Sequence, residues 1–305
     1  MSVTIAIAPA TRPAMAAAFR GAVEAAGGRI SALAAAEGLI WADPARAVAF
    51  PEIIAQAPSV RWIQLPYAGI EPFATHLDER YTWTCAKGVY APPVAEHVLA
   101  LTLAGLRGVH TYARATTWAP PQGHNLFGAA VTVFGGGGIC RAVMAAFAPF
   151  DCRFTVVRRS SEPIDGAGVV GPETALEAVH DADVVILALA LTPQTGGLVD
   201  QSFLAAMAPH AWLVNVARGP HIVTDDLVAV LAEERIGGAA LDVTDPEPLP
   251  VGHPLWSEPR CLITPHTANT AAMAFPLLSE RVRENVARFV RGEKLLGVVD
   301  VAAGY

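Results

Sequence analysis

Short apolar runs alternate with longer amphipathic segments along the chain. The apolar run 184–191, which stops at Thr192-Pro193, is typical of a strand buried on both faces of a parallel sheet. Strands of this kind are predicted at residues 3–8, 39–42, 62–65, 82–85, 131–134, 154–157, 184–187, 212–215, 239–241 and 262–264.

Alanine-rich segments with helical periodicity lie between the predicted strands. Helices are expected at residues 15–26, 94–106, 142–148, 226–233 and 271–290. This alternation predicts βαβ units and therefore a doubly wound α/β architecture. We expect one domain boundary near Pro92-Pro93 and a second near Asn269, so that residues 1–93 and 271–305 form one discontinuous domain and residues 94–270 the other.

The composition indicates a globular protein with two hydrophobic cores and no membrane-spanning helix. A chain of 305 residues, 53% of them apolar, is long enough for two hydrophobic cores. Mean hydropathy is +0.39, yet the apolar runs fall short of the ~20 residues of a membrane helix. The N-terminus has no basic region ahead of an apolar stretch, so no secretory signal is expected.

Charge and cysteine content exclude further classes. The net charge of −7 and the lack of a basic run argue against a nucleic-acid partner. The cysteines form no CxxC pair, and no two histidines fall at ligand spacing on a helix, so no metal site is expected. Reduced thiols and a cytoplasmic location are the simplest interpretation. The four cysteines are Cys85, Cys140, Cys152 and Cys261.

A glycine-rich turn follows the predicted strand 131–134. Gly135 allows a tight turn, and Gly137 lets the backbone approach a pyrophosphate, with Gly138 next to it, at the start of a helix that begins near Ile139. The third position of this fingerprint is usually Gly or Ala but is Cys140 here. A glycine-rich loop without a ligand is the alternative, and the flanking strand and helix favour dinucleotide binding.

The residues after the next strand bear on which dinucleotide is bound. An NAD-binding domain places an acid there, about 20 residues past the first glycine, to bond the ribose hydroxyls. This chain instead has Arg158, Arg159 and Ser160, which suit a 2′-phosphate. NADP is therefore favoured, and Glu162 keeps NAD possible.

Downstream motifs resemble the D-isomer-specific 2-hydroxyacid dehydrogenase family, especially its glyoxylate/hydroxypyruvate reductase-like members. The resemblance covers residues 62–268 and implies two Rossmann-like doubly wound parallel-sheet domains with an active-site cleft between them. Residues 1–93 plus 271–305 would form the substrate (catalytic) domain, and 94–270 the dinucleotide-binding domain. The motifs are QLPYAGI (64–70), VAEHVLAL (94–101), DVVILALALTPQT (183–195), LVNVARG (213–219), GAALDVTDPEPLP (238–250), HPLW (253–256) and TPHTA (264–268).

Three residues match the family's catalytic positions. Arg218 falls on its substrate-binding arginine, Glu247 on its acidic partner and His266 on its acid/base histidine. The chemistry needs these types, because reduction of a 2-keto acid puts negative charge on the carbonyl oxygen. A histidinium can deliver a proton there, a carboxylate can stabilise and orient that histidinium, and an arginine can hold the substrate carboxylate in a bidentate grip.

The resemblance implies further contacts. Backbone amides around Ala68 and Gly69 would receive the substrate carboxylate, beside the bulky Tyr67. Ala190 replaces a proline that the family commonly has in its cofactor loop. The residues expected to line the cofactor are Thr192, Val216, Ala217 and Asp242, with Asp242 facing the nicotinamide carboxamide.

Taken singly, each of these residues has a structural explanation, and only their combination points to chemistry. The predicted function is interconversion of a small 2-keto acid and a D-2-hydroxy acid. Formate or phosphite oxidation is an alternative, although formate dehydrogenases of this superfamily have glutamine where Glu247 stands. A dinucleotide-sensing protein of the corepressor type is another, whereas the lack of a GxSxG elbow argues against a hydrolase. The resemblance and the apolar segment 94–106 together predict a homodimer.

Overall fold

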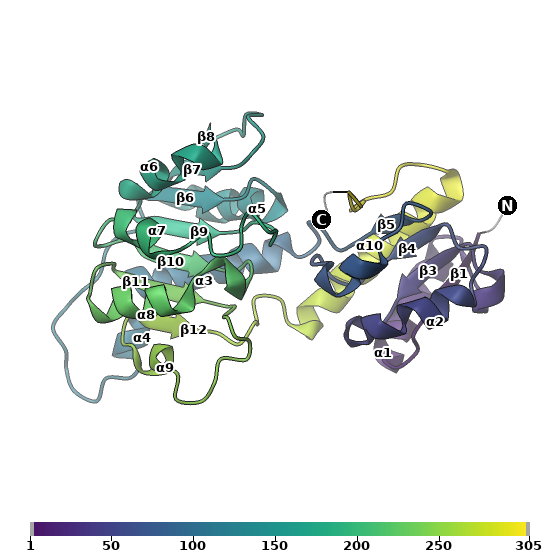
Figure 1. The fold of residues 1–305 in the computed structure, drawn as a ribbon, viewed down its shortest axis with the longest axis horizontal. Helices are drawn as coiled ribbons and strands as arrows, with labels where there is room; N and C mark the ends of the chain where they lie inside the picture. The colour runs from purple at the N-terminus through teal and green to yellow at the C-terminus, as the bar shows by residue number, and fades with distance from the viewer. Residues whose placement is uncertain (1–2, 303–305) are drawn as a thin grey trace. The chain divides into compact units, whose positions relative to one another are not determined.

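A computed structural model describes residues 3–302, in two compact units. Unit 1 combines the chain up to residue 90 with the chain from residue 270 onward, and unit 2 is residues 91–269. Each unit has its own sheet (Figure 1), and every pairing between named strands is parallel. The predicted α/β class is confirmed. Between residues 3 and 302, no helix is both long and apolar enough to cross a membrane.

The sheet of unit 1 has the order β2-β1-β3-β4-β5. Its two faces carry separate cores, one formed with the helices α1 and α10 and the other rich in aromatic rings such as Trp41, Phe50 and Trp83. The strands are β1 (Thr4–Ala8), β2 (Arg29–Ile30), β3 (Gly38–Trp41), β4 (Trp62–Gln64) and β5 (Thr82–Thr84), and the helices are α1 (Pro13–Ala25), α2 (Phe50–Ala55) and α10 (Ala271–Arg291).

The sheet of unit 2 has the order β12-β11-β10-β9-β6-β7-β8. Its strands are β6 (Ala130–Phe134), β7 (Arg153–Val157), β8 (Ala167–Val170), β9 (Val184–Leu187), β10 (Trp212–Asn215), β11 (Gly238–Leu241) and β12 (Cys261–Ile263). Its helices are α3 (Ala91–Leu106), α4 (Val109–Tyr112), α5 (Gly138–Phe147), α6 (Ala175–His180), α7 (Gln201–Ala206), α8 (Thr224–Ala232) and α9 (Pro254–Ser257).

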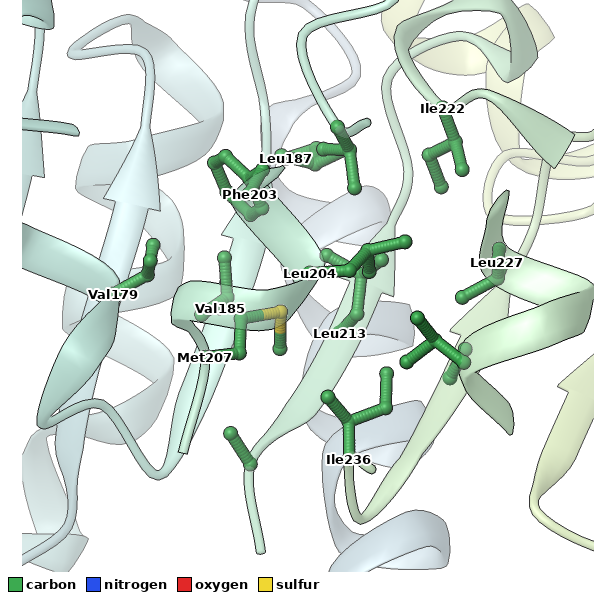
Figure 2. Packing of buried hydrophobic residues seen from close by; sticks show 14 of the residues in the cluster. Val179, Val185, Leu187, Phe203, Leu204, Met207, Leu213, Ile222, Leu227 and Ile236 are labelled. Carbon is green, nitrogen blue, oxygen red and sulfur yellow. The ribbon is translucent and has the colours of Figure 1, made fainter. Parts of the chain in front are cut away.

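Figure 2 shows the core on one face of this sheet. Val185 and Leu187 of β9 and Leu213 of β10 point towards Phe203 and Leu204 of α7, and all five are at most 1% exposed. Strands buried on both faces are uniformly apolar, which is why their sequence shows a continuous run and no alternation.

Two strands of the structure, β2 and β8, were not predicted from the sequence. β2 has only two residues, and β8 is an edge strand that contains Gly168, so neither has the apolar run of a central strand. The helix α5 (Gly138–Phe147) begins at the glycine turn, within one residue of the start expected near Ile139, and contains all but the last residue of the predicted helix 142–148.

The helix α3 begins at Ala91 and contains Pro92 and Pro93 in its first turn, where a missing N–H costs no intrahelical hydrogen bond. A domain boundary after residue 93 would cut this helix, so the boundary that we propose lies between Tyr90 and Ala91.

The apolar character of α3 has an explanation inside unit 2. Its buried residues include Val94, Val98, Leu101 and Leu106, and the helix packs against α5 and β10. The apolar sequence of this helix therefore no longer argues for a subunit interface. The homodimer stays a prediction, which sedimentation of the 31.9 kDa chain can test.

Candidate active site

The predicted site residues of unit 2 follow the carboxyl ends of neighbouring strands. Strand order reverses between β6, which begins the unit's sheet in sequence, and its neighbour β9. In open parallel sheets, the crevice outside the carboxyl ends at such a switch point is where ligands bind. The segments that follow β6, β9, β10, β11 and β12 carry the glycine turn, Thr192, Arg218, Glu247 and His266 in that order.

The glycine turn is shaped by close packing on one side and open space on the other. Gly135 has φ of 102°, and a Cβ there would overlap the carbonyl of Ala188 just after β9. Gly137 is the N-cap of α5, and a Cβ there would meet nothing within 4 Å. In the part of the chain that the structure describes, the amide N–H groups of Gly136 and Gly137 donate to no protein acceptor. This cradle of open donors at a helix N-terminus fits a dinucleotide pyrophosphate.

Arg158 lies beside this turn. Gly135 donates its N–H to the carbonyl of Val157 at 2.9 Å, which brings the end of β7 against the turn. The Arg158 side chain covers Gly136, is 15% exposed, and places Nη2 3.3 Å from Oε2 of the exposed Glu162. Ser160 accepts the N–H of Glu162 at 3.3 Å. The turn therefore has a guanidinium at the position where a cofactor's ribose is expected.

The segment after β9 is closed by its own hydrogen bonds. The hydroxyl of Thr195 donates to the carbonyl of Ala190 at 2.8 Å and accepts the N–H of Thr192 at the same distance. Ala190 thus supplies a carbonyl to this loop, and the hydroxyl of Thr195 fixes the backbone of Thr192.

Arg218 follows β10 on a segment held by the fully buried Asn215. The Asn215 amide accepts the N–H of Ala217 at 3.0 Å and donates to the carbonyl of Arg218 at 2.9 Å. Arg218 also donates from Nη1 to the carbonyl of Ala217 at 2.7 Å. These bonds fix the backbone that presents the guanidinium.

His266 and Glu247 form a direct pair. Nδ1 of His266 lies 2.7 Å from Oε1 of Glu247, and the two side chains are about half exposed. The Glu247 carboxylate accepts a hydrogen bond from the N–H at Nδ1, which leaves Nε2 as the nitrogen that faces other partners.

Asp242 holds the backbone under this pair. It is 2% exposed, and its carboxylate accepts the N–H groups of Thr267 at 2.8 Å and Ala268 at 3.0 Å and the hydroxyl of Thr264 at 2.6 Å. Burial raises the pKa of Asp242, but hydrogen bonds from His97, Thr264 and the two amides outweigh it and lower the pKa to about 2.

His266 itself has φ of 49°, an uncommon left-handed conformation for a residue with a side chain. Its N–H donates to the carbonyl of Asp242 at 2.8 Å. The Asp242 carboxylate and carbonyl together fix this conformation. Contact of Asp242 with the nicotinamide carboxamide stays a prediction, since the partners seen for its carboxylate are Thr264, Thr267 and Ala268 of the segment after β12 and His97 of α3.

In unit 1, the loop after β4 offers backbone donors. Tyr67 is 47% exposed, and within residues 3–302 the N–H groups of Ala68 and Gly69 have no protein acceptor. Below this loop, the buried Gln64 accepts from Thr84 at 2.9 Å and from Asn285 of α10 at 2.8 Å.

Sequence reasoning missed the residues that support these loops. Asn215, Thr195 and the His97–Thr264 pair, whose Nε2–Oγ1 distance is 3.0 Å, touch the backbone that carries the predicted residues. Their one signal was their place inside the matching motifs. In the chain from residue 3 to 302, no three His, Cys, Asp or Glu side chains gather as a metal-binding group.

Comparison with known proteins identifies the relatives of this chain. Residues 97–268 match the profile of the NAD binding domain of D-isomer specific 2-hydroxyacid dehydrogenases. An uncharacterized protein encoded in the proB 3′ region of Corynebacterium melassecola is 39% identical over 84% of this chain and 87% of its own length. Glyoxylate/hydroxypyruvate reductase A of Serratia proteamaculans is 29% identical over 88% of this chain and 87% of its own.

A solved structure agrees. The D-isomer specific 2-hydroxyacid dehydrogenase of Xanthobacter autotrophicus Py2, in complex with NADPH and MES, superposes with a TM-score of 0.86 at 25% identity, with all of both chains covered. The match to the domain profile spans more than half of the present sequence. The chain therefore belongs to the D-isomer specific 2-hydroxyacid dehydrogenases, a family of NAD(P)-dependent oxidoreductases, as its motifs predicted.

Proposed function

We propose that this enzyme reduces a small 2-keto acid of the glyoxylate or hydroxypyruvate type to the D-2-hydroxy acid, and that NADPH is its preferred reductant. The observation that carries the proposal is the 2.7 Å contact between His266 and Glu247 at the carboxyl edge of the sheet in unit 2. The Serratia relative is named for glyoxylate and hydroxypyruvate, which supports the substrate class.

The cofactor is held by residues around the switch point. The open amides of Gly136 and Gly137 and the N-terminus of α5, at Gly138 and Ile139, bind its pyrophosphate. NADPH supplies the hydride when it is bound. Other cofactor contacts come from Thr192, Val216, Ala217 and Asp242, and from Arg158, Arg159 and Ser160 at the 2′-phosphate.

His266 is the general acid. With Nδ1 hydrogen-bonded to Glu247, the imidazolium carries its second proton on Nε2 and delivers it to the carbonyl oxygen of the substrate. Glu247 stabilises the imidazolium and fixes the plane of the ring. In the direction of hydroxy-acid oxidation, the neutral Nε2 accepts the hydroxyl proton.

Arg218 binds the substrate carboxylate with its planar fork and stabilises the negative charge on the carbonyl oxygen. Asn215 keeps this guanidinium in place by holding the carbonyl of Arg218 and the N–H of Ala217.

The loop of unit 1 contributes amide donors. The open N–H groups of Ala68 and Gly69 bind the substrate carboxylate, and Tyr67 limits the size of the substrate. Replacing Ala68 with proline removes one donor and should raise the KM for the keto acid, whereas Ala68→Gly, which keeps the N–H, should leave it nearly unchanged.

The deciding experiment compares His266→Ala with the unmodified enzyme, with glyoxylate or hydroxypyruvate and either NADPH or NADH. We expect kcat to fall by about 10²- to 10⁴-fold, the usual contribution of a positioned general acid, while NADPH binding is kept. His210 is the matched control, since it lies before β10, is 47% exposed, and has Nε2 2.8 Å from the carboxylate of Asp183. His210→Ala should leave kcat unchanged.

Other outcomes point to the alternatives. A chain that binds NADPH but reduces no keto acid would be the dinucleotide-sensing protein. Turnover confined to formate or phosphite would identify a different dehydrogenase. Near-normal keto-acid reduction by His266→Ala would overturn the assignment of the general acid.

A further inference from the structure

A buried histidine lies beneath the cofactor loop. His221, on the short 3-10 helix Gly219–His221 after β10, is fully buried. Its Nδ1 lies 2.8 Å from the carbonyl oxygen of Thr195, and its Nε2 lies 3.3 Å from the carbonyl oxygen of Leu189. Both oxygens are acceptors only, so every hydrogen bond across these contacts must be donated by the ring.

The two carbonyls belong to the two ends of one loop. Leu189 leaves the end of β9, and Thr195 closes the turn that contains Thr192. Because β9 adjoins β6 at the switch point, this loop borders the glycine turn, and Gly135 packs against Ala188 at its base. A neutral imidazole has one N–H, so the shorter contact, with Thr195, is taken as the hydrogen bond of the ring. This bond ties the far end of the loop to the segment after β10.

The same residue is joined to the segment that carries Arg218. The N–H of His221 donates to the carbonyl of Arg218 at 3.3 Å, and that carbonyl also accepts from Asn215. The segment before His221 and the 189–195 loop are therefore connected through one residue, by its backbone N–H and by its ring.

We propose that His221 is a positioning residue, and that its hydrogen bond to the carbonyl of Thr195 holds the 189–195 loop in the conformation that binds the cofactor. This inference rests on the proposed function, in which that loop lines the cofactor. His221 touches no substrate and is not a proton donor in the reaction. Its loss acts on cofactor affinity and leaves the affinity for keto acid nearly unchanged.

The test uses variants that separate hydrogen bonding from packing. His221→Phe keeps an aromatic ring but has no donor, and His221→Asn places an amide nitrogen near the position of Nδ1. We expect the phenylalanine variant to raise the Kd and KM for NADPH about 5- to 10-fold, the effect of one lost hydrogen bond. The asparagine variant should return both to within about twofold of the unmodified enzyme, because the bond to Thr195 is restored.

The matched control is His110, another buried histidine of unit 2 whose two ring nitrogens face backbone carbonyls, those of Ala104 at 3.2 Å and Pro259 at 2.9 Å. His110 lies on α4, outside the segments that follow the strands' carboxyl ends. His110→Phe should lower thermal stability as His221→Phe does, but should leave the Kd for NADPH unchanged.

Fluorescence titration with NADPH gives the Kd of each variant, and separate KM values for NADPH and glyoxylate show whether His221 acts on cofactor affinity alone. If His221→Phe does not fold, the smaller donorless His221→Leu takes its place. The inference is overturned if the donorless variant binds NADPH as the unmodified enzyme does, if His221→Asn binds as weakly as that variant, or if His110→Phe weakens binding equally. An unmodified enzyme that binds neither NADPH nor NADH would overturn the proposed function instead.

Discussion

The two sheets of this enzyme have the same kind of switch point but different residues in it. In unit 1 the strand order reverses between β1 and β3, and in unit 2 between β6 and β9. At the first, the buried Asp43 accepts from the hydroxyl of Thr11 at 2.6 Å and pairs with Nε of Arg12 at 3.0 Å. At the second, Gly136 and Gly137 present backbone donors that bond to no acceptor within residues 3–302.

The difference shows that a parallel sheet supplies the crevice but does not decide its use. In unit 1, the side chains of Thr11, Arg12 and Asp43 bond to one another across the switch point. In unit 2, the corresponding turn is made of glycine, so backbone donors line it and no side chain covers Gly137. The ligand site of a doubly wound fold therefore depends on the few residues that follow its strands.

Two buried carboxylates extend the comparison. Asp43 follows β3 in unit 1 and accepts the N–H of Ala45 in its own loop. Asp242 follows β11 in unit 2 and accepts the N–H of Thr267 in the segment after β12. Only the segment that Asp242 holds, after β12, carries a residue of the candidate catalytic set, His266. The same device thus caps a structural turn in one unit and positions a reactive side chain in the other.

The largest effect is expected at the switch point of unit 2, which we call open because the amides of Gly136 and Gly137 have no protein acceptor within residues 3–302. Gly137→Val adds a side chain where no protein atom lies within 4 Å of the new Cβ, and Gly137 has the extended φ of −82° that valine tolerates. The fold should persist, whereas the pyrophosphate loses two amide contacts, which should raise the Kd for NADPH about 100-fold or more. Gly168→Val on the edge strand β8 is the control. Equal NADPH binding by Gly137→Val would mean that the turn is not the pyrophosphate site.

The next largest effect is expected when the two buried carboxylates, Asp242 and Asp43, are each replaced by asparagine. Asp242→Asn turns an amide donor towards backbone N–H groups and should lower stability by about 1–3 kcal/mol. The displaced His266 should lower kcat by up to about 100-fold. Asp43→Asn should cost stability but leave kcat unchanged. Steady-state kinetics and thermal unfolding of both variants test this difference. Equal loss of kcat in the two variants would show that Asp242 has no special role in positioning His266.

The loss of stability at low pH should depend in part on the carboxylate of Asp242. The pKa of Asp242 is about 2 in the folded enzyme, below its ordinary value of 3.8. Its stabilisation is therefore complete above the ordinary value and is lost as pH falls through about 2. Asp242→Asn should remove this part of the pH dependence between pH 4 and 2, as urea unfolding at several pH values would show.

The sequence predicted the central strands and the family motifs because both leave strong local signals. Continuous apolar runs identify strands such as β9, and the spacing of Arg218, Glu247 and His266 follows from the motifs that contain them. The supporting contacts leave no such signal. That Asp242 is bonded by amides of the segment after β12, or that His221 reaches Thr195, depends on the tertiary fold. The strand β2 is too short to show a period.

A smaller effect tests which cofactor uses the open switch point. The double variant Arg158→Ala, Arg159→Ala should raise the Kd for NADPH about 10-fold or more, since each charge-assisted bond contributes about 1.5–3 kcal/mol, and should change NADH binding little. Arg153→Ala, at the other end of β7, removes an exposed arginine as a control. Tight binding of NADH by the unmodified enzyme, equal to that of NADPH, would contradict the preference.

The smallest functional effect is expected at the switch point of unit 1, which is closed because Thr11 and Arg12 bond to Asp43 across it. Asp43→Ala removes the acceptor for Thr11, Arg12 and the N–H of Ala45, and should lower the free energy of unfolding by about 1–2 kcal/mol, the cost of a lost cap. The Thr11 hydroxyl, with the Ala45 amide and Arg12, lowers the pKa of Asp43, so this stabilisation is present above the ordinary value of 3.8 and lost as pH falls below it. Kinetic constants and the Kd for NADPH should not change. If Asp43→Ala weakens NADPH binding as Gly137→Val does, the two switch points share a function and the contrast between them is wrong.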